Sequence, residues 1–244
     1  MRARLYPIGG PSESGDRPRD DPLPSQAMLL VRLLLAALAG GLLFASAATA
    51  ATLATEKPCY QEGADVVATG TGFGVRALVG IALDGSELGL AQANEQGIFR
   101  NKIVAPSVPA GAREREYDLI ASDGINTAIK HFRATEVFAG FSPSKGRIGT
   151  LRVRFRVFGF GLYKSDAKVY VHYVRPSGKV RRTVYLGEAR GKCGHIRRTR
   201  RRLLFPFTPE RGTWMLQFDT RKSYGKATDE STFAWFRRPV RVGS

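Results

Sequence analysis

The sequence predicts an all-β fold built as two tandem β-sandwich domains. After Ala50, no stretch shows the 3.6-residue apolar period of an amphipathic helix. Short runs that alternate apolar and polar residues recur instead about every eight to twelve residues, the spacing typical of a sandwich. The net charge also changes sharply near residue 140. These three observations together indicate two all-β parts of different electrostatic character.

The first fifty residues are expected to lie outside the fold. Residues 1–27 are polar and rich in Pro, Gly, Asp and Arg, which predicts a disordered extension. Residues 28–50 carry one positive residue, then a charge-free run of Leu, Ala and Gly that ends in Ala48-Thr49-Ala50. This pattern predicts a signal peptide cleaved after Ala50, with translation starting at Met28. We therefore expect a secreted or cell-surface protein.

An uncleaved anchor is the alternative for this leader. The apolar run from Leu29 to Ala50 is about long enough to span a bilayer as a helix. Its many Ala and Gly residues make it a weak spanning segment, so cleavage is favoured.

The charges divide the remaining chain into two parts. Residues 51–140 contain 8 basic and 11 acidic residues, a net charge of −3, whereas residues 141–244 contain 25 basic and 6 acidic residues, a net charge of +19. The Gly, Pro and Ser residues of 139–146 are typical of a boundary. The sequence therefore predicts one domain over 51–139 and a basic second domain over 147–244, which meets something anionic.

The strands of the first domain are expected between turn signals. The dipeptides Asp84-Gly85 and Asp123-Gly124 are strong hairpin turns. A glycine-rich turn covers 70–74. The alternating or apolar runs that flank these three turns predict strands over 65–69, 78–83, 97–104, 116–121 and 125–135.

The second domain opens on a run that alternates without a break. Leu151 to Val157 places three arginines on one face of a strand and four apolar residues on the other. Further strands are expected over 167–174, 179–186, 213–219 and 232–242. The strand over 213–219 buries either Trp214, Leu216 and Phe218 or the opposite register.

A longer stretch of the first domain resembles a known family. Gly70-Thr-Gly-Phe-Gly74, the Asp-Gly turn, Gly97-Ile-Phe99 and the Pro–Gly stretch before Tyr117 resemble bacterial immunoglobulin-like domains of the IPT/TIG group. The resemblance covers residues 55–135, although the family's proline after Gly-x-Gly-Phe is replaced by Gly74 and Val75. It implies a binding or spacer module at the cell surface, with no catalytic residues.

The second domain shares only the order of these features. Gly159-Phe-Gly161 stands where the first domain has Gly70-Thr-Gly72, and both domains later show a glycine before an aromatic and an apolar run. We interpret the two domains as diverged copies of one immunoglobulin-like sandwich, with chance similarity between β domains as the alternative.

The sequence shows no pattern of residues typical of catalysis or of metal binding. A phosphate-binding loop and a Gly-x-Ser-x-Gly elbow are both absent from it. His172 is expected to be a satisfied residue on a strand, and His195, near Cys193, lacks the other ligands of a zinc site. The carboxylates of Glu114, Glu116 and Asp118 are interpreted as a solvated charged edge. We predict a non-catalytic protein without cofactor or metal; a secreted enzyme with an unrecognised active site on a sandwich is the alternative.

The two cysteines predict a structural bond. An even number of cysteines in an exported chain indicates a disulfide, here Cys59–Cys193, which would join the two domains. The sequence does not show that the two residues meet, so the bond stays an expectation.

The basic segment Arg197 to Arg202 has three interpretations. The favoured one is a hairpin arm or edge strand whose charge prevents aggregation. Contact with an anionic envelope polymer, a membrane surface or another surface protein stays open, because charge alone suffices for long-range attraction. Nucleic acid fits an exported protein poorly. The predicted polyanion contacts are Arg197, Arg198, Arg200, Arg201 and Arg202.

Overall fold

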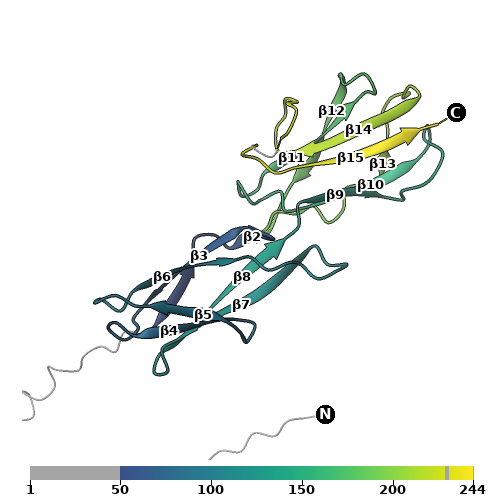
Figure 1. The fold of residues 1–244 in the computed structure, drawn as a ribbon. Coiled ribbons are helices and arrows are strands. Elements are labelled where there is room, and N and C mark those ends of the chain that lie inside the picture. The colour runs from purple at the N-terminus through teal and green to yellow at the C-terminus, as the bar shows by residue number, and fades with distance from the viewer. Residues whose placement is uncertain (1–49, 229–230, 244) are drawn as a thin grey trace, which may run out of the picture. The chain divides into compact units, whose positions relative to one another are not determined.

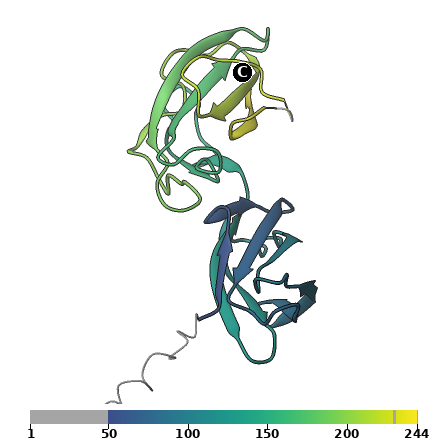
Figure 2. The same ribbon diagram turned by 90° about the vertical axis from the view of Figure 1, so that its left-hand side faces the viewer.

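The computed structural model describes residues 50–228 and 231–243, and within these residues every regular element is a β-strand. The all-β prediction is therefore confirmed. No helix long and apolar enough to cross a membrane occurs among the described residues. The predicted extension and leader, residues 1–49, lie outside the described part. The described residues form one compact unit, in which blue-to-teal and green-to-yellow strands gather in two groups (Figures 1 and 2).

Two sheets make up the first group. One sheet has the order β1-β3-β6 and the other β2-β8-β7-β4-β5; pairing is antiparallel except between β2 and β8. The strands are β1 (Thr52–Thr55), β2 (Cys59–Gln61), β3 (Asp65–Thr71), β4 (Leu78–Leu83), β5 (Ser86–Gln92), β6 (Phe99–Val104), β7 (Glu114–Ser122) and β8 (Thr127–Thr135).

The inward side chains of these two sheets form one buried cluster. Alternation along β4 buries Val79, Ile81 and Leu83, and alternation along β7 buries Tyr117 and Leu119. These side chains stack against the inward side chains of β3 and β6, so the first group is sandwich-like.

The second group also consists of two stacked sheets, here of three and four strands. Its sheets have the orders β13-β10-β9 and β12-β11-β14-β15, both antiparallel. The strands are β9 (Phe138–Ser142), β10 (Arg152–Phe158), β11 (Lys168–Val174), β12 (Val180–Glu188), β13 (Arg202–Leu203), β14 (Gly212–Asp219) and β15 (Trp235–Val242).

The second buried cluster is separate from the first and more aromatic. Trp214, Leu216 and Phe218 of β14 are buried against Phe155 of β10, which settles the register of β14 left open by the sequence. The Phe155 and Phe218 rings lie 5.9 Å apart, a distance typical of packed aromatic pairs.

Strand β9 lies inside the segment predicted as a boundary. Ala139 and Phe141 point into the second cluster. Gly140 is also buried, because the Phe138 ring and Arg238 cover it, and only Ser142 is exposed. The small residues Gly140 and Ser142 give this strand the composition of a linker. The second group of strands therefore starts at Phe138, earlier than residue 147.

Candidate polyanion-binding surface

Strand β10 separates apolar from cationic side chains as its alternation predicts. Val153, Phe155 and Val157 are completely buried, and Arg152, Arg154 and Arg156 are exposed. Because side chains two apart on a strand repeat about every 6.6–6.8 Å, the three arginines form a regular row of positive charge.

The arginine-rich segment runs along the free edge of this strand. Ile196 bridges Val157, and the Thr199 N–H donates to the Phe155 carbonyl at 2.8 Å. Arg202 then pairs with Val153 in the short strand β13. Leu204 and Phe205, which follow, are buried in the second cluster. The segment is thus an irregular edge strand whose apolar end returns to the core, as the sequence predicted.

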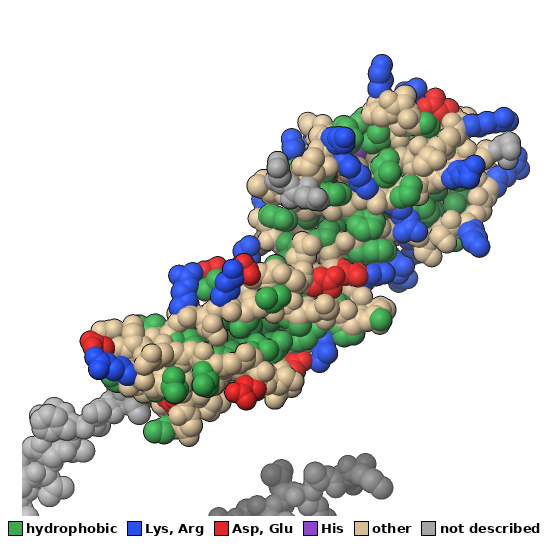
Figure 3. Space-filling view, in the orientation of Figure 1, with side chains coloured by type: hydrophobic (Ala, Val, Ile, Leu, Met, Phe, Trp, Pro, Cys, Tyr) green, Lys and Arg blue, Asp and Glu red, His purple; other side chains and the backbone are tan. Residues whose placement is uncertain are grey.

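The structure brings the segment with all five predicted arginines alongside β10, although the Arg202 side chain turns away from the row and reaches the Tyr185 carbonyl of β12. We name the combined set the arginine surface; it consists of Arg152, Arg154, Arg156, Arg197, Arg198, Arg200, Arg201 and Arg202. None of these arginines takes part in an ion pair within residues 50–228 and 231–243. Lysine and arginine also dominate the charged side chains of the visible face around β9–β15 (Figure 3). Within the described residues, no carboxylate therefore forms a direct ion pair with this surface.

One end of the arginine surface borders the first group of strands. Arg156 and Arg197 line a groove of about 460 Å³ together with Arg113 and Glu114 from the start of β7. The Arg113 guanidinium lies 4.0 Å from the centre of the Phe138 ring, and the Arg156 guanidinium lies 5.8 Å from the same ring. Cation–π contacts of this kind hold both side chains in place.

The disulfide lies beside this end of the surface. Cys59, the first residue of β2, is bonded to Cys193 with a Cα–Cα distance of 5.2 Å, so the predicted bond is present. Cys193 sits in a turn whose backbone is fixed by two hydrogen bonds, from Phe160 N–H to the Gly194 carbonyl and from Gly161 N–H to the Cys193 carbonyl. Gly194 has φ +70° and its Cα lies against Gly161, so a side chain would be excluded at either glycine.

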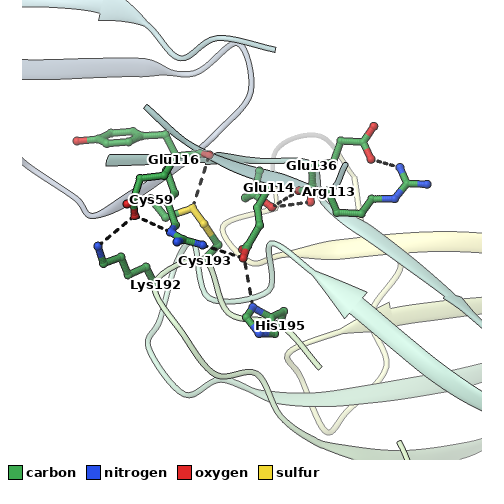
Figure 4. The surroundings of a disulfide bond; sticks show 11 residues. Cys59, Arg113, Glu114, Glu116, Glu136, Lys192, Cys193 and His195 are labelled. Atoms are coloured by element: carbon green, nitrogen blue, oxygen red, sulfur yellow. Dashed lines mark hydrogen bonds and ion pairs between the residues drawn. A yellow bond between two sulfur atoms is a disulfide. The ribbon is translucent and has the colours of Figure 1, made fainter. Parts of the chain in front are cut away.

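Ion pairs surround the disulfide (Figure 4). Arg133 contacts Glu114 and Glu116 at 3.0 Å each, and the Lys192 ammonium lies 3.5 Å from Glu116. The hydrogen bond and charge of Arg133, with help from Lys192, lower the pKa of Glu116 below its usual value. The prediction of a solvated edge is wrong for Glu114, whose side chain is only 15% exposed. Its strand position gave no sign that Arg133 and His195 would cover it.

His195 connects this cluster to the arginine surface. Its Nε2 atom accepts a hydrogen bond from the Arg197 guanidinium at 3.3 Å, which assigns the ring proton of the neutral form to Nδ1. Nδ1 is buried and lies 3.7 Å from Glu114, without a hydrogen-bond partner among the described residues. The ring of His195 also stacks on Phe158. Arg197 is therefore positioned by a residue that is itself held between the two groups of strands.

A second histidine lies in a buried polar network under the loop after β14. His172 Nε2 donates to Asp219 at 3.0 Å and to the Arg221 carbonyl at 3.1 Å, while Nδ1 accepts from Thr183. Gln217 contacts the Gly225 carbonyl and the Ala227 N–H of the same loop. Because His172, Gln217 and Asp219 are fully buried, we interpret the network as the anchor of this loop, and His172 is satisfied as expected.

Two arginines near the surface were not predicted. Arg113 lies in the groove near His195, and Arg182 of β12 lines a further groove with Arg201 and Arg202. Arg182 was visible as half of the pair Arg181-Arg182 in a predicted strand, but the sequence does not show which strand of the opposite sheet faces β13. Within the described ranges no group of histidine, cysteine and acidic residues could hold a metal ion.

Comparisons with known proteins give only distant likenesses. No family model and no curated protein matches the chain. Among solved structures, bovine butyrophilin is 8% identical, with 80% of this chain and 99% of that chain covered and a TM-score of 0.29. Alpha-2-macroglobulin of Escherichia coli, activated by porcine elastase, is 13% identical. The match covers 78% of this chain and 19% of that chain, with a TM-score of 0.27. Dimeric latent PorU from Porphyromonas gingivalis is 13% identical, with coverage of 74% and 18% and a TM-score of 0.28. The chain thus spans less than a fifth of the length of the latter two proteins.

Proposed function

We propose that this protein is an exported, non-catalytic module of two immunoglobulin-like domains at the cell envelope. Its second domain binds an anionic envelope polymer through the arginine surface. The observation that carries the proposal is the gathering of eight arginines along β10 and its edge segment, with no carboxylate paired to them in the described chain.

The electrostatics of this surface favour a polymer over a compact ligand. Exposed charges of one sign raise the local concentration of a polyanion and speed its association. The row on β10 repeats along the strand, so neighbouring charges of an extended chain meet neighbouring arginines at the same time. Binding spread over several weak contacts of this kind gains from multivalency.

The disulfide supports the exported location in this proposal. Disulfides persist in oxidising compartments outside the cytoplasm and are rare inside it. Cys59–Cys193 is buried at both ends and has no free thiol beside it among the described cysteines, which is typical of a structural bond.

The proposal is tested with two double variants of equal charge. Arg154→Ser with Arg156→Ser removes two charges from the arginine surface. Lys222→Ser with Lys226→Ser removes two exposed charges from the loop after β14, where neither lysine makes a hydrogen bond or ion pair with described residues. Binding of the purified protein to an anionic wall polymer is measured at several salt concentrations.

We expect the arginine double variant to bind on the order of tenfold more weakly. The slope of log K against log salt concentration should become less steep by about one to two units, because two charges are removed. The lysine double variant should bind almost as tightly as the unchanged protein. Equal losses in both variants, or wild-type binding that does not weaken with salt, would overturn the proposal.

A further inference from the structure

Four arginines from two different sheets line one open groove of about 370 Å³ at the edge of the second group of strands. They are Arg152 of β10, Arg182 of β12, and Arg201 and Arg202 at the start of β13. β12 and β13 are both edge strands of their sheets, so the groove lies where the sandwich is open at its side.

Two of these arginines cross the opening in opposite directions. The Arg202 guanidinium donates to the Tyr185 carbonyl on β12 at 3.1 Å. The Arg182 guanidinium donates to the Pro206 carbonyl, just after β13, also at 3.1 Å. A backbone carbonyl on each side of the opening therefore accepts from an arginine of the other side, and both guanidinium groups are held at the groove before any ligand binds.

A third arginine is fixed in the same way. Arg201 Nε donates to the Arg152 carbonyl at 3.3 Å, which holds it beside the exposed Arg152 side chain. A guanidinium has five N–H donors, and Arg182, Arg201 and Arg202 each use one of them in these backbone contacts. Most donors of the groove thus remain free for a ligand.

The groove concentrates positive charge next to apolar surface. Val184, Leu203 and Pro206 form part of its lining, and no carboxylate does. Tyr173 lies beneath with its hydroxyl donating to the Leu204 carbonyl at 2.8 Å, and burial raises the pKa of that hydroxyl, so it stays neutral. Four like charges in this setting repel one another unless an anion lies between them.

A purely structural role explains only part of this arrangement. Arginines that bridge two strand edges protect those edges, and one donor from each of Arg182 and Arg202 is enough for that purpose. Edge protection does not explain why Arg152 and Arg201 lie at the same groove. Neither has a carboxylate partner in the described residues.

We propose that the groove is a specific site for a phosphate group. Guanidinium forks match the geometry of phosphate oxygens, and a phosphate monoester carries close to two negative charges and three acceptor oxygens that several arginines can share. This inference rests on the proposed function, because it assigns the groove to phosphate groups of the bound polymer. A phospholipid headgroup or free inorganic phosphate would present the same chemistry.

The test measures binding of inorganic phosphate and pyrophosphate to the full protein by calorimetry. Arg182→Met and Arg201→Met each remove one charge while they keep an apolar stem of similar length. Arg211→Met is the matched control, because Arg211 is exposed, lies outside the groove lining and makes no hydrogen bond or ion pair with described residues. We expect on the order of tenfold weaker binding of both anions in each groove variant, and unchanged binding in the control.

The remaining measurements separate this site from the proposed function. A phosphate-containing wall polymer should lose affinity in Arg182→Met, and a polymer with carboxylates alone should lose much less. If inorganic phosphate fails to bind, or binds Arg182→Met and Arg211→Met equally, the phosphate site is wrong, while polymer binding that depends on Arg154 and Arg156 would still stand. Binding to vesicles of anionic phospholipid, with none to wall polymer, would keep the site and overturn the proposed polymer.

A variant that does not fold is recognised by its circular dichroism. In that case Arg182→Lys replaces Arg182→Met, since lysine keeps the charge and loses the fork. Phosphate affinity equal to wild type in Arg182→Lys would contradict the bidentate contact on which the site depends.

Discussion

Asp123 fastens two loops of the first group of strands with one carboxylate. It accepts hydrogen bonds from the N–H groups of Ile125 and Asn126 in its own turn, and from the Gly74 N–H at 2.7 Å in the loop after β3. These contacts hold the pKa of Asp123 far below its usual value, because each backbone N–H stabilises the charged form. The glycine-rich loop therefore depends on a residue 49 positions away in the chain.

Replacement of Asp123 should destabilise the protein in a pH-dependent way. Because the pKa is lowered on folding, the charged carboxylate stabilises the fold at every pH above the unfolded value of 3.8, and this contribution is lost as the pH falls below it. Asp123→Ala should thus lower the melting temperature at pH 7 and approach the wild-type melting temperature in more acidic solution. Thermal unfolding from about pH 2.5 to pH 7 checks this; a difference that stays constant with pH would contradict it.

Individual residues also show what the sequence could and could not predict. Leu151 to Val157 alternates without interruption, so its strand, its buried face and its row of arginines were all predictable. β5 was missed because its side chains are mostly exposed and give no apolar face. Glu114 and Arg182 owe their roles to partners on other strands, and tertiary contacts of this kind leave no local pattern.

Among the strands, the irregular edge beside β10 is held by one buried hydroxyl in addition to its backbone hydrogen bonds. The Thr199 Oγ1 atom accepts a hydrogen bond from the Phe155 N–H at 3.0 Å and donates to the Arg200 carbonyl at 3.0 Å. Five arginines within three residues of Thr199 repel one another, so this anchor helps to hold the segment in its register along β10.

Thr199→Val should loosen this edge strand. Valine keeps the shape and removes the hydroxyl, which leaves the buried Phe155 N–H without an acceptor and costs about 1–3 kcal/mol of unfolding free energy. Thr199→Ser keeps the hydroxyl and is the control, with a smaller expected loss. Urea unfolding gives the free energies, and amide exchange at Phe155 should quicken in the valine variant alone. Equal stability of the two variants would show that the hydroxyl does not hold the edge.

At the level of the whole unit, the disulfide and the ion pairs around it join the two groups of strands. Cys59 belongs to the first group and Cys193 to the second, and Lys192 and His195 on either side of Cys193 reach Glu116 and Glu114. The exposed ion pair adds little, since such pairs contribute about 0–1 kcal/mol. The covalent bond is therefore expected to be the main stabilising link at this junction.

Removal of the disulfide should lower the stability substantially. The bond closes a loop with a sequence separation of 134, for which loop-closure entropy predicts a contribution of about 5 kcal/mol. The double variant Cys59→Ser with Cys193→Ser should lose up to that amount in urea unfolding. Reductant should produce a similar loss in the unchanged protein and no further loss in the variant. A loss below about 1 kcal/mol would place the stability of the unit elsewhere.

The same bond also decides how the molecule responds to being pulled. When tension is applied at residues outside the Cys59–Cys193 loop, the force passes through the two sulfur atoms and bypasses the chain between them. A separation of 134 residues corresponds to about 450 Å of extended chain. This length of chain cannot extend under tension while the disulfide is intact, and reduction of the bond would allow it to extend.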